Sequence, residues 1–549
     1  MAYTIKSAKE QTFLISSAAL ENVASRMIGF MIDDDGSLFV NEVPPRHADT
    51  GVYALIERNG DKISISQDYC GSFGLFLYKD EEGFLLSNSF YAIAEGIPEK
   101  LSLNKAYLAS FMYAKDSPAD YTGTLANEIT RIESDTIVEI CIPTKEISFR
   151  KKSMPYFTRT LRTQEDFAIL DKWYCKWVSF YRSLAEQKKP FYADISGGLD
   201  TRIILSMLIN ANLDLHSSVR MTTHATVNIP KDAEDMRISK IISDTLHFPL
   251  NSGLIHLQKA GNLRPEEAYQ FIRQFSIERS FYSKFIELRY QTPIFSAKGL
   301  GSIIKGSVGS SGKAWNGMQE VFSEYDTTAD TLLDRQPFPS EDEREKHKTH
   351  CHEIVRKHAE KLLSGAPYDG QYAATYFYKR VWIEERDVKK ILINFLNNRI
   401  EASPFIDPLI NTFDYNPYGD DPLFLATLIL SRYAPQLLAF EIEHRAFSPD
   451  SIERAAELNR QFPPHLPAYD KISGTEHTVL TDSCESEEMT AHLRSILTSR
   501  DFKELVDSAI GKEARETILS AVPVEKHLKL PFRSYSLIAL YEFLKLLPR

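Results

Sequence analysis

Residues 191–202 read Phe-Tyr-Ala-Asp-Ile-Ser-Gly-Gly-Leu-Asp-Thr-Arg and carry the strongest structural signal in the chain. An extended run ends in Ser196–Asp200, and a strongly apolar helical stretch follows at once over residues 203–209. This order predicts a strand, a glycine turn and a helix. Paired glycines let the backbone approach a ligand closely. The Ser196 hydroxyl and the first amides of the new helix then point to one place, where the helix dipole favours an anion.

Asp200 adds a carboxylate to this turn, suited to Mg²⁺, the usual companion of a nucleoside triphosphate. An ordinary strand-to-helix turn is the alternative, which the Ser-Gly-Gly string alone does not exclude. The strand, Asp200 and the helix in register favour a nucleotide-binding loop. A kinase-type phosphate loop is excluded, because its nearest approach, Gly306–Lys313, has one residue too many between its glycines and is followed by Ala314 instead of Ser or Thr.

Length and composition indicate a soluble globular protein with two or more domains. The chain has 549 residues, of which 43% are hydrophobic and 25% are charged. Its net charge of -11 argues against a nucleic-acid-binding surface, and no apolar run reaches the length of a membrane span. The five cysteines are scattered without a C-x-x-C pair, and the first ten residues lack the apolar core of a signal peptide. We therefore expect a cytoplasmic protein with no nucleic-acid or membrane partner.

The first part of the chain, residues 1–160, is expected to form a mostly antiparallel domain. A helix is expected over residues 104–113, and Asp33–Gly36 reads as a turn. Short β-rich runs, separated by Gly, Asp and Asn, recur over residues 51–56, 62–66, 74–78, 83–87 and 136–140.

The second part, residues 161–549, is expected to alternate strands and helices before turning mainly helical. It opens with an amphipathic helix over residues 163–187, with Thr163 as its N-cap. Strand–helix alternation implies parallel βαβ units, which bind ligands at the carboxyl ends of their strands. The further elements expected are a strand over residues 215–222 and helices over 231–246, 341–363, 371–399 and 423–430, the last started by Asp420 and Asp421. Histidines 347, 350 and 352, with Cys351, read as a solvated helix face and not as a metal cluster.

Several motifs in this order resemble the asparagine synthetase family, which includes β-lactam synthetases and lasso-peptide cyclases. Ser196–Arg202 is similar to the loop of N-type ATP pyrophosphatases, and the corner Pro404–Asp407 reads Pro-Phe-Ile-Asp. In the first part, Gln67–Tyr78 and Phe84–Ala94 resemble the "D-x-x-G-x-x-P-L-Y" and "F-A-S-E-x-K-A-L" segments of class II glutamine amidotransferase domains. The resemblance covers most of the chain. It implies an Ntn-type β-sandwich domain followed by an ATP pyrophosphatase domain with a helical extension.

The resemblance also implies an ATP site. Asp200 would be the Mg²⁺ ligand, and the adenine would lie near Val219 and Met221. A second loop would contribute Lys298 and Gly299. The residues expected around the triphosphate are Ile195, Ser196, Gly197, Gly198, Leu199, Asp200 and Thr201.

A catalytic set is implied in the same way. Glu384 and Glu385 lie where β-lactam synthetases place a glutamate that helps to deprotonate the attacking amine. Lys471 resembles the loop lysine that stabilises transition-state charge in that family. For each of these residues an exposed side chain without a catalytic role is the alternative.

The N-terminus departs from the family in a way that bears on glutamine chemistry. Glutamine-hydrolysing members use a cysteine at the mature N-terminus as nucleophile, whereas this chain opens Met1-Ala2-Tyr3 and its first cysteine is Cys70. We expect no glutaminase activity and a front domain that serves as a scaffold.

The second departure lies in Ser296–Gly306, the stretch that corresponds to a Gly-rich loop of the family. Ile303 stands where the family has its second Mg²⁺-binding aspartate, and Leu300 stands near the reacting centre. Three alternatives follow: Asp200 and phosphate alone hold the metal, Lys305 or Lys298 replaces one metal contact, or the enzyme is impaired.

The sequence as a whole predicts an ATP-dependent, AMP-forming amide ligase that requires ATP and Mg²⁺. Its substrate would be a small-molecule or peptide carboxylate, and a homodimer is possible. The alternatives are transfer of the adenylated acyl group to a nucleophile other than an amine, and a catalytically impaired ATP-binding homologue that acts as a partner or regulator.

Overall fold

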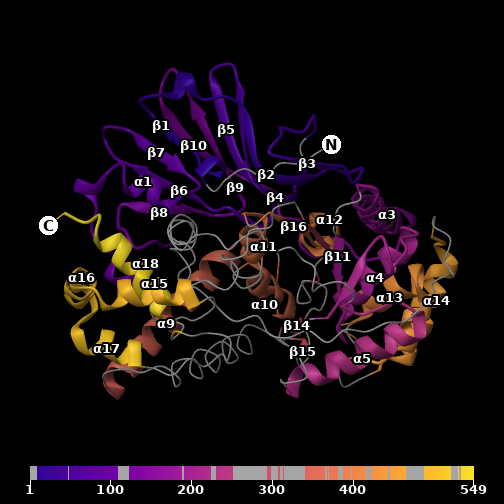
Figure 1. Cartoon of the computed structure of the whole chain (residues 1–549). Coiled ribbons are helices and arrows are strands. Elements are labelled where there is room, and N and C mark those ends of the chain that lie inside the picture. Colours follow the sequence, from indigo (N-terminus) through magenta and orange to yellow (C-terminus); the bar gives the residue numbers. More distant parts are fainter. Residues whose placement is uncertain are drawn as a thin grey trace.

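Figure 1 shows the computed structural model of the chain, in which antiparallel sheets from the first part of the sequence lie above a parallel sheet and several groups of helices. The residues that the structure describes are 9–46, 48–108, 123–187, 191–223, 230–251, 294–297, 299, 307–308, 313–314, 340–364, 368, 370–380, 388–396, 398–415, 421, 423–442, 446–464, 487–520, 530 and 533–548.

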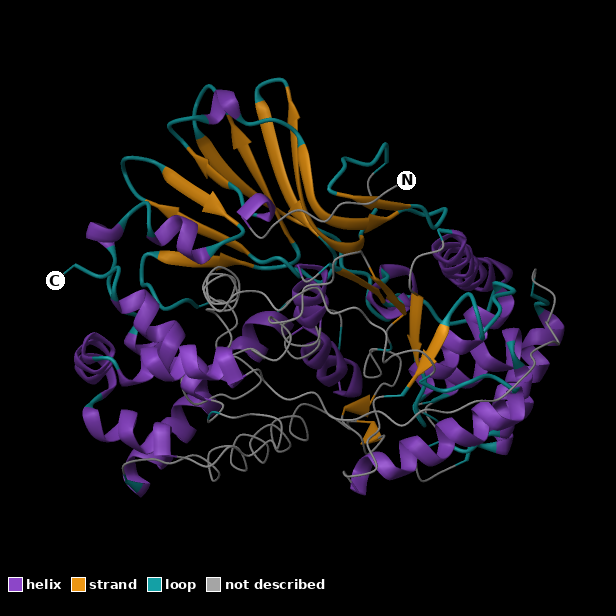
Figure 2. Ribbon diagram, in the orientation of Figure 1, coloured by secondary structure: helices purple, strands orange, loops and turns teal. Residues whose placement is uncertain are grey.

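Two antiparallel sheets form the front part, seen as the two fans of strands in Figure 2. One has four strands in the order β1-β7-β6-β8, and the other has six in the order β10-β9-β5-β4-β2-β3. Their bounds are β1 Leu14–Ser16, β2 Arg26–Ile32, β3 Leu38–Val40, β4 Thr50–Asn59, β5 Lys62–Gln67, β6 Leu75–Lys79, β7 Phe84–Ser87, β8 Ile129–Ile132, β9 Thr136–Cys141 and β10 Glu146–Lys151. The five β-rich runs found in the sequence lie in β4, β5, β6, β7 and β9, and every pairing within these two sheets is antiparallel.

The pattern of β9 shows why these segments form strands. Thr136, Val138 and Ile140 are buried, and the residues between them are partly exposed, so the strand has one face on the core. A short helix, α1 (Phe90–Ala94), follows β7 and is capped by Ser89, whose side chain accepts a hydrogen bond from the amide of Ala92. Residues 105–108 of the expected helix are helical, and the rest of that helix lies outside the described residues.

Helix α3 (Gln164–Glu186) connects the front part to the parallel sheet and matches the helix predicted over residues 163–187. Thr163 and Asp166 form a capping box, in which each side chain bonds to the backbone amide of the other. The helix buries Trp173, Trp177 and Phe180 completely. One hydrophobic cluster of described residues runs from the front sheets through this helix to the parallel sheet.

The second sheet system is parallel, with strand order β12-β11-β13-β16. Its strands are β11 (Phe191–Asp194), β12 (Arg220–Thr222), β13 (Ile294–Ala297) and β16 (Arg399–Ala402). Helices α4 (Leu199–Asn210) and α5 (Pro230–Leu246) follow β11 and β12. The fold is therefore mixed α/β, with antiparallel sheets first and a parallel sheet afterwards. A small antiparallel pair, β14 (Ser307–Val308) with β15 (Lys313–Ala314), lies apart from this sheet.

Two sequence expectations in this region are wrong in their bounds. The strand expected over residues 215–222 is only β12, because the Asp214 side chain accepts hydrogen bonds from His216 and Ser217 and stabilises a turn there. Among the described residues of the helix expected over 371–399 are α10 (Gly370–Tyr378) and α11 (Val388–Leu396), and its last residue, Arg399, already belongs to β16.

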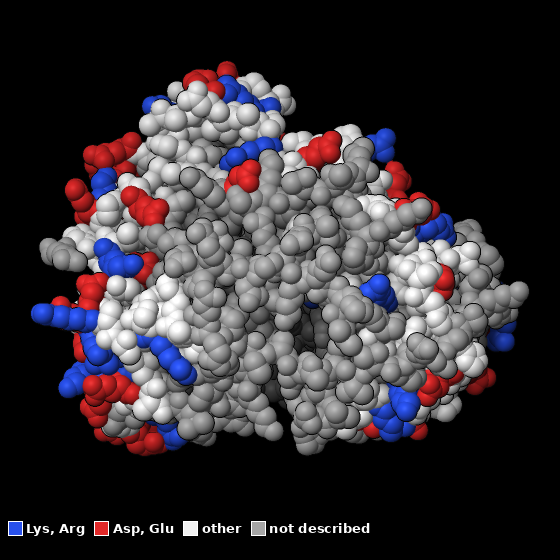
Figure 3. Space-filling view, viewed as in Figure 1, with Lys and Arg blue, Asp and Glu red and all other residues white. Residues whose placement is uncertain are grey.

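Further helices complete the chain: α9 (Glu341–Leu363), α12 (Pro408–Asn411), α13 (Phe424–Tyr433), α14 (Pro449–Gln461), α15 (Glu487–Thr498), α16 (Arg500–Ile510), α17 (Lys512–Ser520) and α18 (Arg533–Leu544). The last of them returns to the front part. The ring of Phe543 lies 5.6 Å from that of Phe90, and the Tyr91 hydroxyl donates to the Ala539 carbonyl at 3.3 Å. No helix among the described residues is both long and apolar enough to cross a membrane. On the face in Figure 3, acidic and basic side chains of the described residues lie close to one another in several places.

Candidate functional site

The loop between β11 and α4 has the strand–turn–helix order that its sequence predicts. Strand β11 ends at Asp194, and Gly198 is the N-cap of α4, with φ −76° and ψ 160°. Because β11 lies between β12 and β13, this loop leaves the sheet at the carboxyl end of a central strand. That is the edge at which open parallel sheets bind their ligands.

Hydrogen bonds within the loop hold its backbone in a tight curve. The Ser196 amide donates to Thr201 Oγ1 at 3.1 Å, and the Gly198 amide donates to Ser196 Oγ at 3.0 Å. The Ile195 amide donates to the Thr222 carbonyl of the neighbouring strand at 2.7 Å. Ser196 and Thr201 therefore stabilise the turn in this structure, with their hydroxyl groups 3.1 Å apart.

Helix α5 contacts the same loop at two points that the sequence reading missed. Asp235 Oδ1 accepts a hydrogen bond from the Gly197 amide at 2.7 Å. One turn later on the helix, the buried Ser239 hydroxyl lies 2.6 Å from the Asp235 carbonyl of its own helix and 3.2 Å from the Ile195 carbonyl of the loop, and it can donate to either. The spacing of four residues places both side chains on one face of α5.

Asp200 lies between two glycines from different loops. A Cβ built on Gly198 would be 2.7 Å from Asp200 Oδ1, and one built on Gly299 would be 2.2 Å from Asp200 Oδ2. Any side chain at Gly299 would therefore displace the carboxylate. Gly299 follows β13, which pairs in parallel with β11, so the sheet brings the two loops together. Asp200 is partly exposed, and it is held at the N-terminus of α4 where an oxygen ligand for Mg²⁺ was expected.

Val219 and Met221 have fully buried side chains in the hydrophobic core. Met221 belongs to β12, pairs with Ala193, and accepts a hydrogen bond from the Asn251 amide at 2.8 Å. Both residues thus have a packing role that is independent of any ligand.

Arg202, in the first turns of α4, joins this helix to α5 through one segment of the chain. Its guanidinium is completely buried and donates to the carbonyl groups of Phe440 and Glu441. The Glu441 side chain in turn accepts from Arg237 of α5 at 2.8 Å. Burial lowers the pKa of Arg202 to about 10. The two helices that flank the loop are therefore tied together at Glu441.

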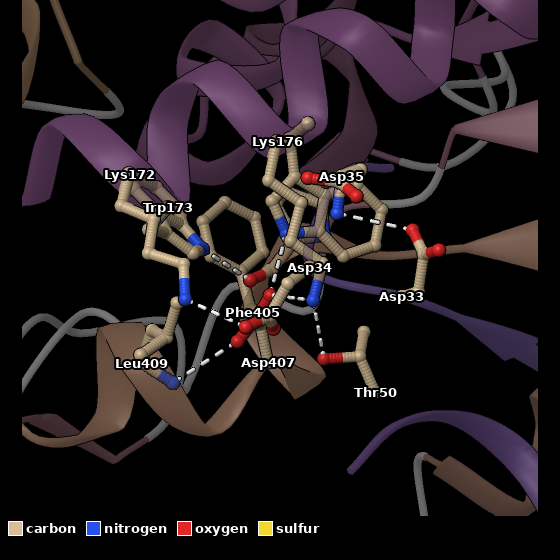
Figure 4. Close-up of polar contacts among 12 residues, drawn as sticks. Asp33, Asp34, Asp35, Thr50, Lys172, Trp173, Lys176, Phe405, Asp407 and Leu409 are labelled. Atoms are coloured by element: carbon tan, nitrogen blue, oxygen red, sulfur yellow. Dashed lines mark hydrogen bonds and ion pairs between the residues drawn. The ribbon is translucent and has the colours of Figure 1, made fainter. Parts of the chain in front are cut away.

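The Pro404–Asp407 corner lies at the carboxyl end of β16, and its aspartate is buried. Figure 4 shows the polar contacts of Asp407. Asp407 Oδ2 lies 2.9 Å from Lys176 Nζ and accepts from Trp177 Nε1 at 3.0 Å. Asp407 Oδ1 accepts from the Leu409 amide at 3.0 Å and caps α12. Lys176 Nζ also donates to Thr50 Oγ1 at 2.8 Å. This corner therefore links α3, β4 and the end of the parallel sheet.

The Asp33–Gly36 turn packs on α3 beside this ion pair. The predicted turn is confirmed by the hydrogen bond from the Gly36 amide to the Asp33 carbonyl at 3.1 Å. Gly36 has φ +83°, and a Cβ there would be 2.6 Å from the Lys176 carbonyl, so only glycine allows this approach. Asp34 pairs with Lys172 at 2.6 Å.

In the front part, Cys70 is a buried free thiol in a turn organised by Asp68. The Asp68 carboxylate accepts hydrogen bonds from the amides of Tyr53, Cys70 and Ser72 at 3.0 to 3.2 Å. Cys70 thus lies in the interior of a packed turn, away from the solvent that a nucleophile needs.

Several predicted site residues lie outside the described residues: Lys298, Leu300, Ile303, Lys305, Glu384, Glu385 and Lys471. Their roles remain predictions. Within the part of the chain that the structure describes, no group of three or more His, Cys, Asp or Glu side chains is arranged to hold a metal ion.

The charged helix predicted over residues 341–363 is present in the structure as α9.

Comparison with models of known protein families found no match, and no curated protein has a significantly similar sequence.

Proposed function

We propose that this chain is an ATP-dependent, AMP-forming amide ligase. It would adenylate a substrate carboxylate, release pyrophosphate, and join the acyl group to an amine without hydrolysing glutamine. In this proposal the antiparallel front part is an Ntn-type scaffold related to class II glutamine amidotransferases. The part around the parallel sheet is an ATP pyrophosphatase domain with a helical extension.

One observation carries the proposal: the loop Ser196–Asp200 and Gly299 meet at the carboxyl edge of the parallel sheet. The Ser196 loop begins a helix, whose first amides favour an anion such as a phosphate. Asp200 lies in the first turn of this helix, and its carboxylate suits Mg²⁺, which would neutralise phosphate charge when bound. This arrangement combines small loop residues, the start of a helix and a carboxylate. It favours binding of a nucleoside triphosphate over binding of an uncharged ligand.

The reaction balances without any further cofactor. A carboxylate oxygen attacks the α-phosphorus of ATP, and the bond to the β-phosphate breaks, which gives an acyl adenylate and pyrophosphate. The amine then attacks the acyl carbon, AMP leaves with the former carboxylate oxygen, and the amine loses a proton. In the family that the sequence resembles, a glutamate at the place of Glu384 or Glu385 helps to remove this proton. Positive charge from Lys471 or Lys305 would stabilise the leaving groups.

A catalytically impaired ATP-binding homologue is the second candidate, and Ile303 is the observation that favours it. An apolar side chain where a metal-binding aspartate is expected removes a ligand for a hard cation. The intact Ser196–Asp200 segment favours the active enzyme.

Pyrophosphate release tests the proposal. Purified protein would be incubated with ATP, Mg²⁺ and a panel of amino acids, small organic acids and peptides, with the Asp200→Ala variant as matched control. The proposal expects pyrophosphate from wild type with at least one carboxylate, with an equal amount of AMP where an amine is also present, and neither product from the variant. ATP binding without pyrophosphate would favour the impaired homologue or an untried carboxylate. Absence of ATP binding would refute the proposed function.

A further inference from the structure

The Gly197 amide, one of the loop donors that a phosphate would use, is occupied in this structure by a carboxylate. Asp235 Oδ1 accepts from it at 2.7 Å, a length typical of a charge-assisted hydrogen bond. The neighbouring Ser196 and Gly198 amides bond to neutral hydroxyl groups instead. Asp235 is thus an internal anion placed where an external anion is expected.

The charged residues near Asp235 form ion pairs with one another, and the Asp235 carboxylate bonds to the loop instead. Glu234, the preceding residue, pairs with Arg237 at 2.7 Å, and Arg237 also pairs with Glu441 at 2.8 Å. Within the described part of the chain, the one hydrogen-bond partner of the Asp235 side chain is the Gly197 amide. Asp235 is also partly exposed, so its side chain has solvent into which it can turn.

The helix that carries Asp235 has a separate attachment to the loop. The buried Ser239 hydroxyl bonds to the Ile195 carbonyl, and Glu441 ties α5 to α4 through Arg237 and Arg202. Helix α5 can therefore stay in place when the Asp235 side chain leaves the Gly197 amide.

We propose that Asp235 is an internal competitor for the anion site of the Ser196 loop, and that a phosphate group takes its place on the Gly197 amide when the ligand binds. This inference rests on the proposed function, because it requires that the loop binds an anion. When the phosphate replaces Asp235 on the Gly197 amide, the Asp235 carboxylate also moves away from the negative charge of the phosphate. Asp200 already places one carboxylate at the same loop, so this movement reduces the repulsion between the loop and the ligand.

The test measures binding of ATP and of inorganic pyrophosphate, each with Mg²⁺, to wild type, Asp235→Ala and Asp235→Asn. Freeing the amide and removing the charge should tighten pyrophosphate binding about 10-fold in Asp235→Ala, since tenfold corresponds to a modest hydrogen-bond energy. Asp235→Asn keeps an acceptor for the amide but removes the charge, so its affinity should fall between those of wild type and Asp235→Ala. Ser239→Ala is the matched control, because it removes a contact between α5 and the loop without freeing an amide, and it should not tighten binding.

Hydrogen exchange of the peptide that contains Gly197 gives a readout without ligand. Exchange of its amides should be faster in Asp235→Ala than in wild type, and bound pyrophosphate should slow it again. Tighter binding by Asp235→Ala, whether or not wild type binds detectably, supports the inference. Intact wild-type binding with unchanged or weaker binding in Asp235→Ala overturns it while the proposed function stands. If neither protein binds pyrophosphate or ATP, the proposed function fails and the inference with it.

Discussion

Replacement of Lys176 by methionine should destabilise the protein by about 3 kcal/mol. The Lys176 and Asp407 side chains are 2% and 1% exposed, and their charged atoms lie 2.9 Å apart. Methionine removes the positive charge and leaves a buried carboxylate, a loss that costs about 3–5 kcal/mol in other buried pairs. Trp177 Nε1 and the Leu409 amide would still donate to Asp407, so we expect the lower end of this range.

Lys172→Met is the matched control, because Lys172 lies one turn earlier on the same helix and also forms an ion pair. That pair, with Asp34, is 50% and 63% exposed, and pairs of this kind contribute about 0–1 kcal/mol. Urea unfolding followed by tryptophan fluorescence measures both variants, and Trp173 and Trp177 lie beside the buried pair. Equal losses in the two variants would refute the reasoning.

A double-mutant cycle isolates the pair itself. Asp407→Asn keeps an acceptor for the Leu409 amide and removes the charge, so combining it with Lys176→Met should cost less than the two single losses added together. We expect a coupling of about 2 kcal/mol, within the usual range for contacting residues. Additive losses would show that the lysine acts through packing and not through Asp407.

Three further predictions concern the site and the pH dependence of stability. Asp200→Ala should abolish Mg²⁺-dependent turnover with little change in unfolding free energy, because the residue is partly exposed at a ligand loop; unchanged turnover would contradict this. Glutamine should give no ammonia that depends on Cys70, because its thiol is buried in the turn that Asp68 organises, and ammonia release that is lost in Cys70→Ser would contradict this. Burial alone would raise the pKa of Glu133, but hydrogen bonds from Lys151 and Lys361 outweigh it and lower the pKa to about 2. A depressed carboxyl pKa stabilises the fold above the unfolded value, so this stability should be lost as the pH falls from about 4.5 to 2, and Glu133→Gln should flatten that part of the stability curve.

The features that the sequence predicted correctly are those with a local physical cause. Thr163 is the predicted N-cap of α3 and bonds to an amide only three positions later, and the turn after β11 follows from two consecutive glycines. The alternation in β9 likewise depends on neighbouring residues only. Gly299 was assigned to the same site as Asp200 through the family resemblance alone, and the parallel pairing of β11 with β13 gives a physical reason for their meeting.

The features that the sequence did not reveal depend on contacts between distant segments. Asp235 lies 38 residues from Gly197, and an aspartate in a helix is ordinarily a solvated residue. Lys176 and Asp407 meet from separate elements, and a lysine on an amphipathic helix gives no sign that it will be buried. Strand β16 reads Arg-Ile-Glu-Ala, which has little β-propensity, and its pairing with β13 selects the extended form.

The contact of helix α18 with helix α1 has a consequence for how the protein is made. Tyr91 and Ala539 are 448 residues apart, so a ribosome must synthesise most of the chain before the front sheets can cover this part of their surface. Until then the aromatic side chain of Phe90, which is buried in the finished protein, lacks the ring of Phe543 against which it packs. The front part therefore has to wait in a partly exposed state during translation, in which chaperones or early aggregation compete with its final packing.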